Sequence, residues 1–227
     1  MNGIKVILFD IDNTLLDFNK GAKAAMEKCL EGHGIASDDE MFDTFLRIND
    51  SLWRKIETAE LTKAELHRTR WQLIFKELGI ALDGEAFEKE FLDALQTSAR
   101  PVDGAFETLD YLYGKYTLCA ASNAPYEQQI KRLSNVGMMK YFSKLFISEK
   151  IGYSKPSKEF FDACFKELPG IFKDQTAIIG DSLTADINGG IEYGLRTVWF
   201  NYAKADVPEN LGADYVVNSL SEIKGIL

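Results

Sequence analysis

Short apolar runs that alternate with longer amphipathic stretches constrain most strongly what this chain can fold into. The runs are 6–9, 116–121, 145–147, 177–179, 197–200 and 215–217. Each is rich in branched or aromatic residues and is bounded by polar residues or glycine, which is typical of a strand buried on both faces. Between the later runs lie stretches of helix length, such as 125–136 and 157–168. This alternation predicts a parallel sheet that is covered by helices on both faces.

One long segment, from about residue 18 to residue 98, interrupts the alternation. It has apolar residues at helical spacing, for example Phe45, Ile48 and Leu52, and it has no convincing strand. Pro101 and Gly104 then mark the return to the sheet. We therefore expect an α/β core formed by 1–17 and 99–227, with a four-helix cap, 18–98, inserted between the first two strands. We expect this cap to lie over the strand ends.

The composition is that of an ordinary globular protein, with 46% hydrophobic and 27% charged residues. The net charge of -9 argues against a nucleic-acid polymer as the partner, because such partners are bound through basic surfaces. An acidic protein that binds a phosphate needs a bound cation or local lysine and amide groups. The charge therefore directs attention to a metal site.

The cysteines and the first strand bear on the cellular compartment. Cys29, Cys119 and Cys164 lie far apart among apolar neighbours and are interpreted as reduced packing residues. The apolar run 6–9 is too short for a signal peptide or a membrane span. We expect a cytoplasmic monomer or homodimer with no membrane partner.

Two aspartates, Asp10 and Asp12, follow the first strand. In open parallel sheets ligands gather outside the carboxyl ends of the strands, so both carboxylates are candidates for a binding site. Two carboxylates this close repel each other unless a cation or a shared proton separates their roles. Taken alone, they could also be turn or helix-capping residues, which is the less favoured alternative.

Two further segments provide candidate phosphate contacts. Ser122 and Asn123 stand between the second strand and a helix whose first turn contains Pro125, and a helix N-terminus with a hydroxyl can bind an anion. A plain helix cap is the alternative. Pro156 disfavours helix at Lys155, so we expect Lys155 in an extended loop, where it is a candidate for a fixed positive charge beside a phosphoryl group. Most lysines are merely solvated.

The last acidic segment contains Asp181, which directly follows the buried strand 177–179 and Gly180. Asp181 is expected at the same sheet edge as Asp10. Carboxylate and carbonyl oxygens suit a hard cation such as Mg²⁺. Each segment taken alone is weak evidence for a site. However, the acid pair, the hydroxyl group, the lysine and the last acid all lie at strand ends or in strand-end loops, which favours one shared site.

These four segments resemble the motifs of the haloacid dehalogenase superfamily of phosphohydrolases over the full length of the chain. The resemblance implies a Rossmann-like parallel-sheet core with an inserted helical-bundle cap. It also implies that Asp10 attacks phosphorus and becomes an aspartyl phosphate, while Asp12 protonates the leaving oxygen and later deprotonates water. The carboxylates of Asp10 and Asp181 and the main-chain carbonyl of Asp12 would bind Mg²⁺.

The same resemblance assigns the remaining polar residues of the motifs. Thr14, Ser122, Asn123 and Lys155 would bind the phosphate, and Asp186 would orient the metal site from outside. True dehalogenases lack an acid at the position of Asp12, because a carbon–halogen bond needs no leaving-group proton. The expected reaction is therefore hydrolysis of a phosphate ester.

A closer resemblance concerns 47–54 (RINDSLWR), 69–71 (TRW) and 180–190 (GDSLTADINGG), which are similar to the bacterial house-cleaning pyrimidine 5'-nucleotidases. It implies a nucleoside monophosphate as the small phosphorylated substrate. Phe18 and Trp53 are candidates for stacking on the base, and Arg70 for touching it. The plain alternatives are aromatic residues in the core and solvated arginines.

Two alternatives stay open. A phosphoglycolate or sugar-phosphate phosphatase, or a phosphosugar mutase, would keep every catalytic residue and differ only in the cap. A non-catalytic phospho-acceptor or regulatory binding protein is the alternative of a different class, and the presence of Asp12 argues against it. No cysteine is followed by the loop and arginine of a cysteine-based phosphatase, and no Walker loop is present.

Overall fold

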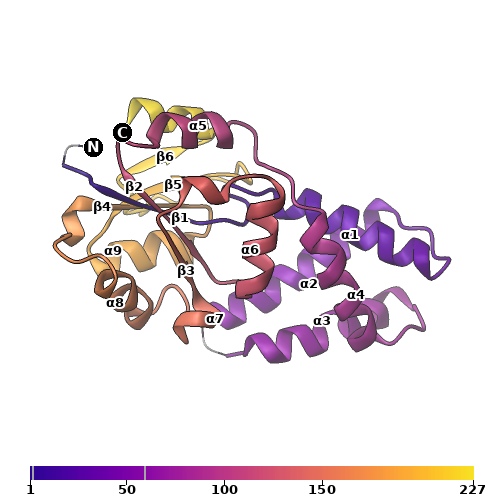
Figure 1. Cartoon of the computed structure of the whole chain (residues 1–227). Coiled ribbons are helices and arrows are strands. Elements are labelled where there is room, and N and C mark those ends of the chain that lie inside the picture. Colours follow the sequence, from indigo (N-terminus) through magenta and orange to yellow (C-terminus); the bar gives the residue numbers. More distant parts are fainter. Residues whose placement is uncertain (2, 59) are drawn as a thin grey trace. The chain divides into compact units, whose positions relative to one another are not determined.

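The computed structural model describes residues 1, 3–58 and 60–227, which form two compact units. One unit consists of Met1–Asp17 and Arg100–Leu227, and the other of Phe18–Ala99. Figure 1 shows strands only in the first unit and helices alone in the second, as far as the residues are described. Each unit has its own cluster of buried hydrophobic side chains.

The first unit contains a six-stranded sheet in the order β3-β2-β1-β4-β5-β6, and all of its strand pairs are parallel. The strands are β1 (Val6–Phe9), β2 (Thr117–Ser122), β3 (Lys144–Ile147), β4 (Thr176–Gly180), β5 (Arg196–Phe200) and β6 (Tyr215–Val217). The predicted parallel α/β sheet is thus confirmed. The second strand ends one residue later than expected, so that Ser122 belongs to the strand itself.

Helices cover both faces of this sheet, and Figure 1 shows α5 on one side with α8 and α9 on the other. The helices of this unit are α5 (Ala105–Leu112), α6 (Tyr126–Asn135), α7 (Ser148–Ile151), α8 (Lys158–Lys166) and α9 (Gly189–Tyr193). Shorter 3₁₀ segments are Met139–Tyr141, Lys173–Gln175 and Leu220–Gly225, and Leu183–Asn188 is a π-helical segment.

The central strand β1 is buried along its whole length because helices cover both of its faces. Val6 and Leu8 point to the same face, since side chains alternate along a strand, and pack in one cluster with Phe160 and Phe161 of α8. Burying one such side chain contributes about 1.5–3 kcal/mol. This packing makes β1 a rigid platform for the residues that follow it.

The second unit is a bundle of four helices in its described part. They are α1 (Phe18–Gly32), α2 (Asp39–Glu57), α3 (Lys63–Leu78) and α4 (Gly84–Thr97). Asp38 and Asp83 cap the N-termini of α2 and α4, and Thr62 forms a capping box with Glu65 at the start of α3. Gly79 ends α3 in the left-handed conformation.

The core of the helical unit is aromatic. Trp71 of α3 is 1% exposed, and its ring centroid lies 4.5 Å from Phe87 and 5.1 Å from Phe91, both with edge-on geometry. Phe45 of α2 lies 5.4 Å from Trp71. The helical periodicity in the sequence therefore corresponds to one shared apolar core of α2, α3 and α4.

The described residues include all three cysteines and the helices of both units. Cys29, Cys119 and Cys164 are buried and free, as expected for packing residues. Among these residues no helix has both the length and the apolar character needed to cross a bilayer.

Candidate active site

Asp10 directly follows β1 at the carboxyl end of the sheet. Phe9 pairs with Ala120 of β2 and with Ile179 of β4, and the main-chain N–H of Asp10 donates to the Ile179 carbonyl at 2.9 Å. This pairing brings the segments that follow β1, β2 and β4 to one edge of the sheet. Ligands bind at this edge in open parallel sheets.

Lys155 connects the acidic groups at this edge. Its Nζ donates to Oδ1 of Asp10 at 2.7 Å, to Oδ1 of Asp186 at 2.6 Å and to the carbonyl of Ala121 at 2.5 Å. The residue is only 2% exposed, and a buried ammonium group is tolerated only when its protons are satisfied in this way. The structure therefore places the candidate residues Lys155 and Asp10 side by side.

Asn123 supports the loop that carries Lys155. Its side-chain Oδ1 accepts from the N–H of Lys155 at 2.9 Å, and its Nδ2 donates to the Lys155 carbonyl at 2.8 Å. Both ends of the amide are thus used by the main chain. The geometry places Asn123 as a support of Lys155 instead of among the phosphate-binding groups that the sequence suggested.

Three carboxylates converge at the same edge. One oxygen from each of Asp10, Asp181 and Asp186 lies within 4.8 Å of the other two. Asp186 is anchored by Lys155 and by the main-chain N–H of Ser182, which donates to its Oδ2 at 3.1 Å. Hard oxygen ligands around one point suit a divalent cation such as Mg²⁺, so the donor set fits that ion.

Gly180 allows Asp186 to approach the end of β4. A Cβ atom at Gly180 would lie 2.1 Å from Oδ2 of Asp186, far inside van der Waals contact. The glycine in the predicted Gly180–Asp181 turn is therefore a packing requirement of the acidic cluster.

The charges at this edge are strongly coupled. The pKa of Asp10 is raised to about 7, chiefly by burial: Lys155 lowers it, whereas Asp186 and Asp12 add to the rise. Burial also raises the pKa of Asp181, to which Asp10 and Asp186 contribute. Burial of Lys155 disfavours its charge, but Asp10 and Asp186 outweigh this and raise its pKa above the ordinary value. A bound cation would favour the ionised carboxylates, so the cluster is suited to one.

Asp12 lies in the turn after β1, where Asn13 has a φ of 57°. Its side chain is 28% exposed and accepts hydrogen bonds from two residues of α6. Nε2 of Gln129 lies 2.7 Å from Oδ2 of Asp12, and Nη1 of Arg132 lies 2.5 Å from Oδ1. Asp12 is thus held next to Asp10 while part of its surface stays open.

Thr14 and Ser122 contribute hydroxyl groups near the acid pair. Thr14 is fully buried, and its Oγ1 has no hydrogen-bond partner among the described residues. Ser122 is 2% exposed, and its Oγ accepts from Nε2 of Gln129 at 2.9 Å and from the N–H of Ala124 at 3.3 Å. A buried hydroxyl without a partner is costly, which is consistent with a polar ligand at Thr14.

A comparison of the amino-acid sequence with models of protein families shows the family of this chain. The model of the haloacid dehalogenase-like hydrolases matches residues 4–194 of this chain. The chain belongs to this family. The resemblance drawn from the motifs is therefore confirmed.

Among its relatives, this hydrolase is 36% identical to HAD-hydrolase YfnB of Bacillus subtilis, over all of this chain and 97% of YfnB. The crystal structure of YfnB bound to magnesium has a TM-score of 0.92 at 34% identity and covers 99% of this chain and 98% of that one. The close agreement of the two folds confirms the HAD-like architecture.

Several relatives carry a phosphatase activity in their names, among them glyceraldehyde 3-phosphate phosphatase of Pyrococcus furiosus, which is 30% identical over all of this chain and 94% of that protein, and two pyrimidine 5'-nucleotidases. Pyrimidine 5'-nucleotidase PynA of Streptococcus pneumoniae is 35% identical over 87% of this hydrolase and 84% of PynA. Pyrimidine 5'-nucleotidase YjjG of Escherichia coli is 27% identical over 97% of this hydrolase and 96% of YjjG.

The suggested substrate contacts of this hydrolase lie in the helical unit. Phe18 begins α1, is partly buried and has its ring 6.5 Å from Phe45 in stacked geometry. Trp53 of α2 is also partly buried against the aromatic core. The contacts of both residues within the unit are those of packing residues, which was the plain alternative.

Arg70 is placed differently from what the sequence suggested. It is 2% exposed, its Nε and Nη2 donate to Glu88 at 3.2 and 2.7 Å, and its Nη1 donates to Asn49 at 2.9 Å. The guanidinium carbon also lies 4.9 Å from the ring centroid of Phe91. Because all of these partners are internal to the bundle, Arg70 is a structural residue, and we remove it from the set of substrate contacts.

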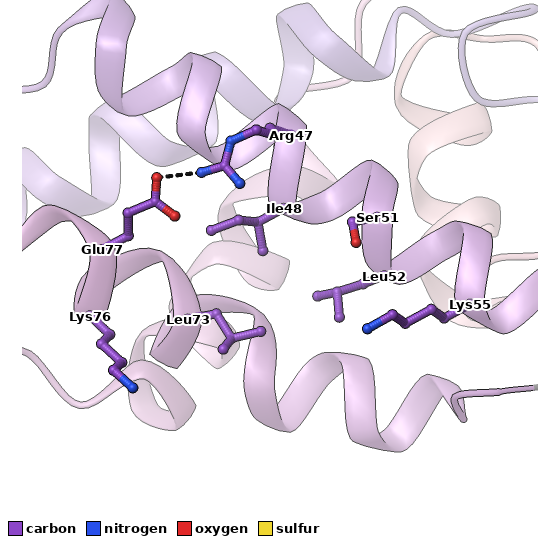
Figure 2. A pocket seen from close by; sticks show the side chains of 8 residues that line it. All are labelled: Arg47, Ile48, Ser51, Leu52, Lys55, Leu73, Lys76 and Glu77. Carbon is purple, nitrogen blue, oxygen red and sulfur yellow. Dashed lines mark hydrogen bonds and ion pairs between the residues drawn. The ribbon is translucent and has the colours of Figure 1, made fainter.

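The helical unit of this hydrolase also has a surface groove of about 410 Å³ between α2 and α3. Figure 2 shows Ile48, Leu52 and Leu73 along the groove, with Lys55 and Lys76 beside it and Arg47 paired with Glu77 at one end. The arginine at position 47, which the sequence placed in the nucleotidase-like segment, is therefore engaged by an acidic neighbour.

Two residues that bind Asp12 were missed by the sequence analysis, namely Gln129 and Arg132. Both are buried, at 0% and 1% exposure, although they are polar. They stand three residues apart on α6, and so share one face of that helix. A polar pair on the buried face of the helix after the second strand is the signal that would have indicated them.

Proposed function

We propose that this hydrolase is a magnesium-dependent phosphatase that cleaves a pyrimidine nucleoside 5'-monophosphate through an aspartyl-phosphate intermediate. The single observation that carries the proposal is the meeting of Asp10, Asp181 and Asp186 with Lys155 at the carboxyl edge of the sheet, with Asp12 beside them. A nucleophile, an acid–base group, a cation site and a fixed positive charge are the parts that phosphoryl transfer requires.

In the first step a carboxylate oxygen of Asp10 attacks phosphorus, and the bond from phosphorus to the ester oxygen breaks. Asp12 gives its proton to the departing oxygen, which leaves as the alcohol of the nucleoside. In the second step water attacks phosphorus of the aspartyl phosphate, Asp12 takes a proton from that water, and Asp10 is released as a carboxylate together with inorganic phosphate.

Mg²⁺ would be held by the carboxylates of Asp10 and Asp181 and by the main-chain carbonyl of Asp12. When bound, it neutralises charge on the phosphoryl oxygens. Asp186 would orient the metal site through its hydrogen bonds with the ammonium group of Lys155 and the main-chain N–H of Ser182. Lys155 supplies a second positive charge beside the transferred group.

The phosphate would be bound by Thr14, Ser122 and Lys155. The support for Thr14 is its buried hydroxyl, which has no partner in the described part of the chain. The support for Ser122 is that both of its hydrogen bonds use the hydroxyl oxygen as an acceptor, which suits donation of its proton to a phosphoryl oxygen. Asn123 then acts indirectly, by holding Lys155.

The helical unit, Phe18–Ala99, is proposed as the cap that selects the substrate. The two chain crossings into it are tied together within the α/β unit, since the N–H of Asp17 donates to the carbonyl of Arg100 at 2.7 Å. The hydroxyl of Tyr202 donates to Asp17 at 2.7 Å. These bonds support a defined hinge at residues 17 and 100, where a cap could open and close. Interdomain movement is described for the YfnB crystal structure.

The nucleotide preference is supported by the names of PynA and YjjG and by the nucleotidase-like segments of the sequence. The test is release of inorganic phosphate from nucleoside monophosphates, sugar phosphates and phosphoglycolate, with Mg²⁺ and with chelator. We expect the largest kcat/KM for a pyrimidine monophosphate and no release with chelator or with Asp10→Asn.

Other outcomes of this experiment separate the alternatives. Preference for a sugar phosphate or phosphoglycolate would keep the mechanism and overturn the nucleotide assignment. Conservation of the phosphate and dependence on a bisphosphate activator would indicate a mutase. Full activity of Asp10→Asn would overturn the covalent mechanism, and no release from any ester would favour a regulatory phospho-acceptor.

A further inference from the structure

The carboxylate of Asp12 accepts hydrogen bonds from two residues of α6. Gln129 donates through Nε2 to Oδ2 at 2.7 Å, and Arg132 donates through Nη1 to Oδ1 at 2.5 Å. Each oxygen of Asp12 thus has one partner, and the two bonds together define the orientation of the carboxyl plane. We call Gln129 and Arg132 the α6 clamp.

The α6 clamp is itself held rigidly. Nη1 of Arg132 also donates to Oε1 of Gln129 at 2.9 Å, and Nε2 of Gln129 also donates to Oγ of Ser122 at 2.9 Å. Ser122 is the last residue of β2, so the clamp is connected to the sheet that carries Asp10 through its neighbouring strand. Asp12, Ser122 and α6 therefore form one connected polar network.

Stability alone does not account for this network. Arg132 is 1% exposed, and its Nε and Nη2 have no hydrogen-bond partner among the described residues. Unsatisfied buried donors are costly, and a buried ion pair is often no more stabilising than apolar residues of similar size. Nη1 of this buried arginine donates to both Asp12 and Gln129. A role in fixing the position of the Asp12 carboxylate explains the arginine better than a gain in stability does.

We propose that Gln129 and Arg132 are positioning residues that hold the carboxyl group of Asp12 for proton transfer, an inference that rests on the proposed phosphatase reaction. The charged guanidinium of Arg132 binds Oδ1, whereas the hydrogen bond that the described residues make to Oδ2 comes from the neutral amide of Gln129, so Oδ2 is the oxygen suited to carry the exchangeable proton. A carboxylate oxygen has a second lone pair, and on Oδ2 that lone pair takes and gives the proton. The clamp residues exchange no proton themselves.

This assignment predicts a dependence on the leaving group. In the first step the bond from phosphorus to the ester oxygen breaks, and the proton on Oδ2 of Asp12 moves to that oxygen. An alkyl ester such as a nucleoside monophosphate needs this proton, whereas a nitrophenyl ester leaves readily without it. Loss of the clamp should therefore slow the alkyl ester selectively.

The experiment compares kcat/KM for a nucleoside monophosphate and for p-nitrophenyl phosphate in Gln129→Leu and Arg132→Met. The ratio kcat/KM reports only the steps up to departure of the leaving group, so slower hydrolysis of the aspartyl phosphate does not enter it. We expect a loss of roughly 10- to 100-fold for the nucleotide and less than about threefold for the aryl ester. Asp12→Asn should show the same pattern with a larger loss.

Matched controls separate positioning from folding. Gln128→Leu removes the same kind of side chain from the neighbouring position of α6, which is also buried at 8% exposure, and Gln128 donates no hydrogen bond to Asp12 in the described structure. It should leave the ratio of the two substrates unchanged. Arg132→Lys keeps one positive donor and should recover part of the nucleotide activity. If Arg132→Met does not fold, Gln129→Leu and Arg132→Lys carry the comparison.

Each result has a definite meaning. Equal losses on the two esters in folded clamp variants would overturn the positioning role and leave the phosphatase reaction standing. A wild-type chain that hydrolyses neither ester with Mg²⁺ would overturn the proposed function, and the clamp assignment with it. Selective loss on the nucleotide, absent in Gln128→Leu, supports the assignment.

Discussion

Lys155 and Asp10 form a buried ion pair, with Nζ of the lysine 2.7 Å from Oδ1 of the aspartate although 145 residues separate them. The same ammonium group also binds Asp186, so one lysine holds two acids from the segments that follow β1 and β4.

Removing Lys155 should affect both activity and stability. Lys155→Met leaves Asp10 and Asp186 without their buried counter-charge, and breaking one side of such a pair costs about 3–5 kcal/mol. We expect kcat to fall by about 100-fold or more, because a preorganised charge beside the phosphoryl group is lost. Steady-state kinetics and urea denaturation measure the two effects.

The matched control for this variant is Lys158→Met, because Lys158 pairs with Asp162 at the surface, where the lysine is 72% exposed. An exposed pair of this kind contributes little, so both readouts should stay near the wild-type values. A Lys155→Met protein as stable and active as the control would contradict the role assigned to the buried pair.

A side chain at Gly180 should displace Asp186. In Gly180→Ala the new Cβ would lie 2.1 Å from Oδ2 of Asp186, so the carboxylate must leave its bonds to Ser182 and Lys155. We expect a folded protein with at least about tenfold weaker Mg²⁺ binding, in line with losses on disturbing outer ligands of a metal site. Calorimetric titration with Mg²⁺ measures this affinity directly.

Gly32 provides the comparison for that substitution. It ends α1, and a Cβ there meets no atom within 4 Å. Gly32→Ala should bind Mg²⁺ like the wild type and should be equally stable or slightly more stable. Unchanged Mg²⁺ affinity in Gly180→Ala would show that the position of Asp186 is unimportant to the metal site.

The metal-free protein should lose stability as pH rises from about 4 to about 7. Burial raises the pKa of Asp10 from 3.8 to about 7, so across this range the folded protein keeps a proton that the unfolded chain releases. The folded state then binds more protons, and raising the pH favours unfolding until the folded carboxyl has also ionised. Above about pH 7 this contribution should be lost completely.

Urea denaturation at several pH values in chelator tests this dependence, with Asp10→Asn as the control. The variant lacks the titrating group and should show a smaller decline with pH. Because a bound cation favours ionised carboxylates, we expect Mg²⁺ to stabilise the wild type more at pH 8 than at pH 5. Identical pH dependence of wild type and Asp10→Asn in chelator would rule out Asp10 as the source.

Arg70 should matter for the stability of the helical unit and not for substrate binding. Arg70→Met leaves Glu88 buried without its guanidinium partner, at an expected cost of about 3–5 kcal/mol. The KM for the preferred ester should stay unchanged at a temperature where the variant is folded. Arg47→Ala is the control, since the pair of Arg47 with Glu77 is half exposed and contributes at most about 1 kcal/mol. A raised KM in folded Arg70→Met would return Arg70 to the substrate contacts.

Much of the α/β unit could be predicted because its signals are local. The apolar runs predicted all six strands of the sheet, and the acids, hydroxyl and lysine that follow them were predicted to meet at one edge. The parallel topology forces the carboxyl ends of β1, β2 and β4 together whatever the details of packing. This is why Asp10, Lys155 and Asp181 were found from their positions along the chain.

The helical unit was less predictable. Helical spacing correctly indicated its helices, but the same spacing cannot distinguish a substrate contact from a core residue, because both lie on one face of a helix. Arg70 resembled a surface arginine in sequence and is buried against Glu88, Asn49 and Phe91. Its partners come from other helices, so only the packing of the bundle could identify them.

The fold class, the family and the order of the motif residues could therefore be inferred from the amino-acid sequence, because they depend on periodicity and on residue types at strand ends. The pairing of the polar groups became clear from the packing of the folded chain. In the folded chain Asn123 is hydrogen-bonded to the main chain of Lys155, and Gln129 and Arg132 of α6 are hydrogen-bonded to Asp12. Hydrogen bonds of this kind depend on side-chain directions and distances between elements far apart in the chain, which no local pattern encodes.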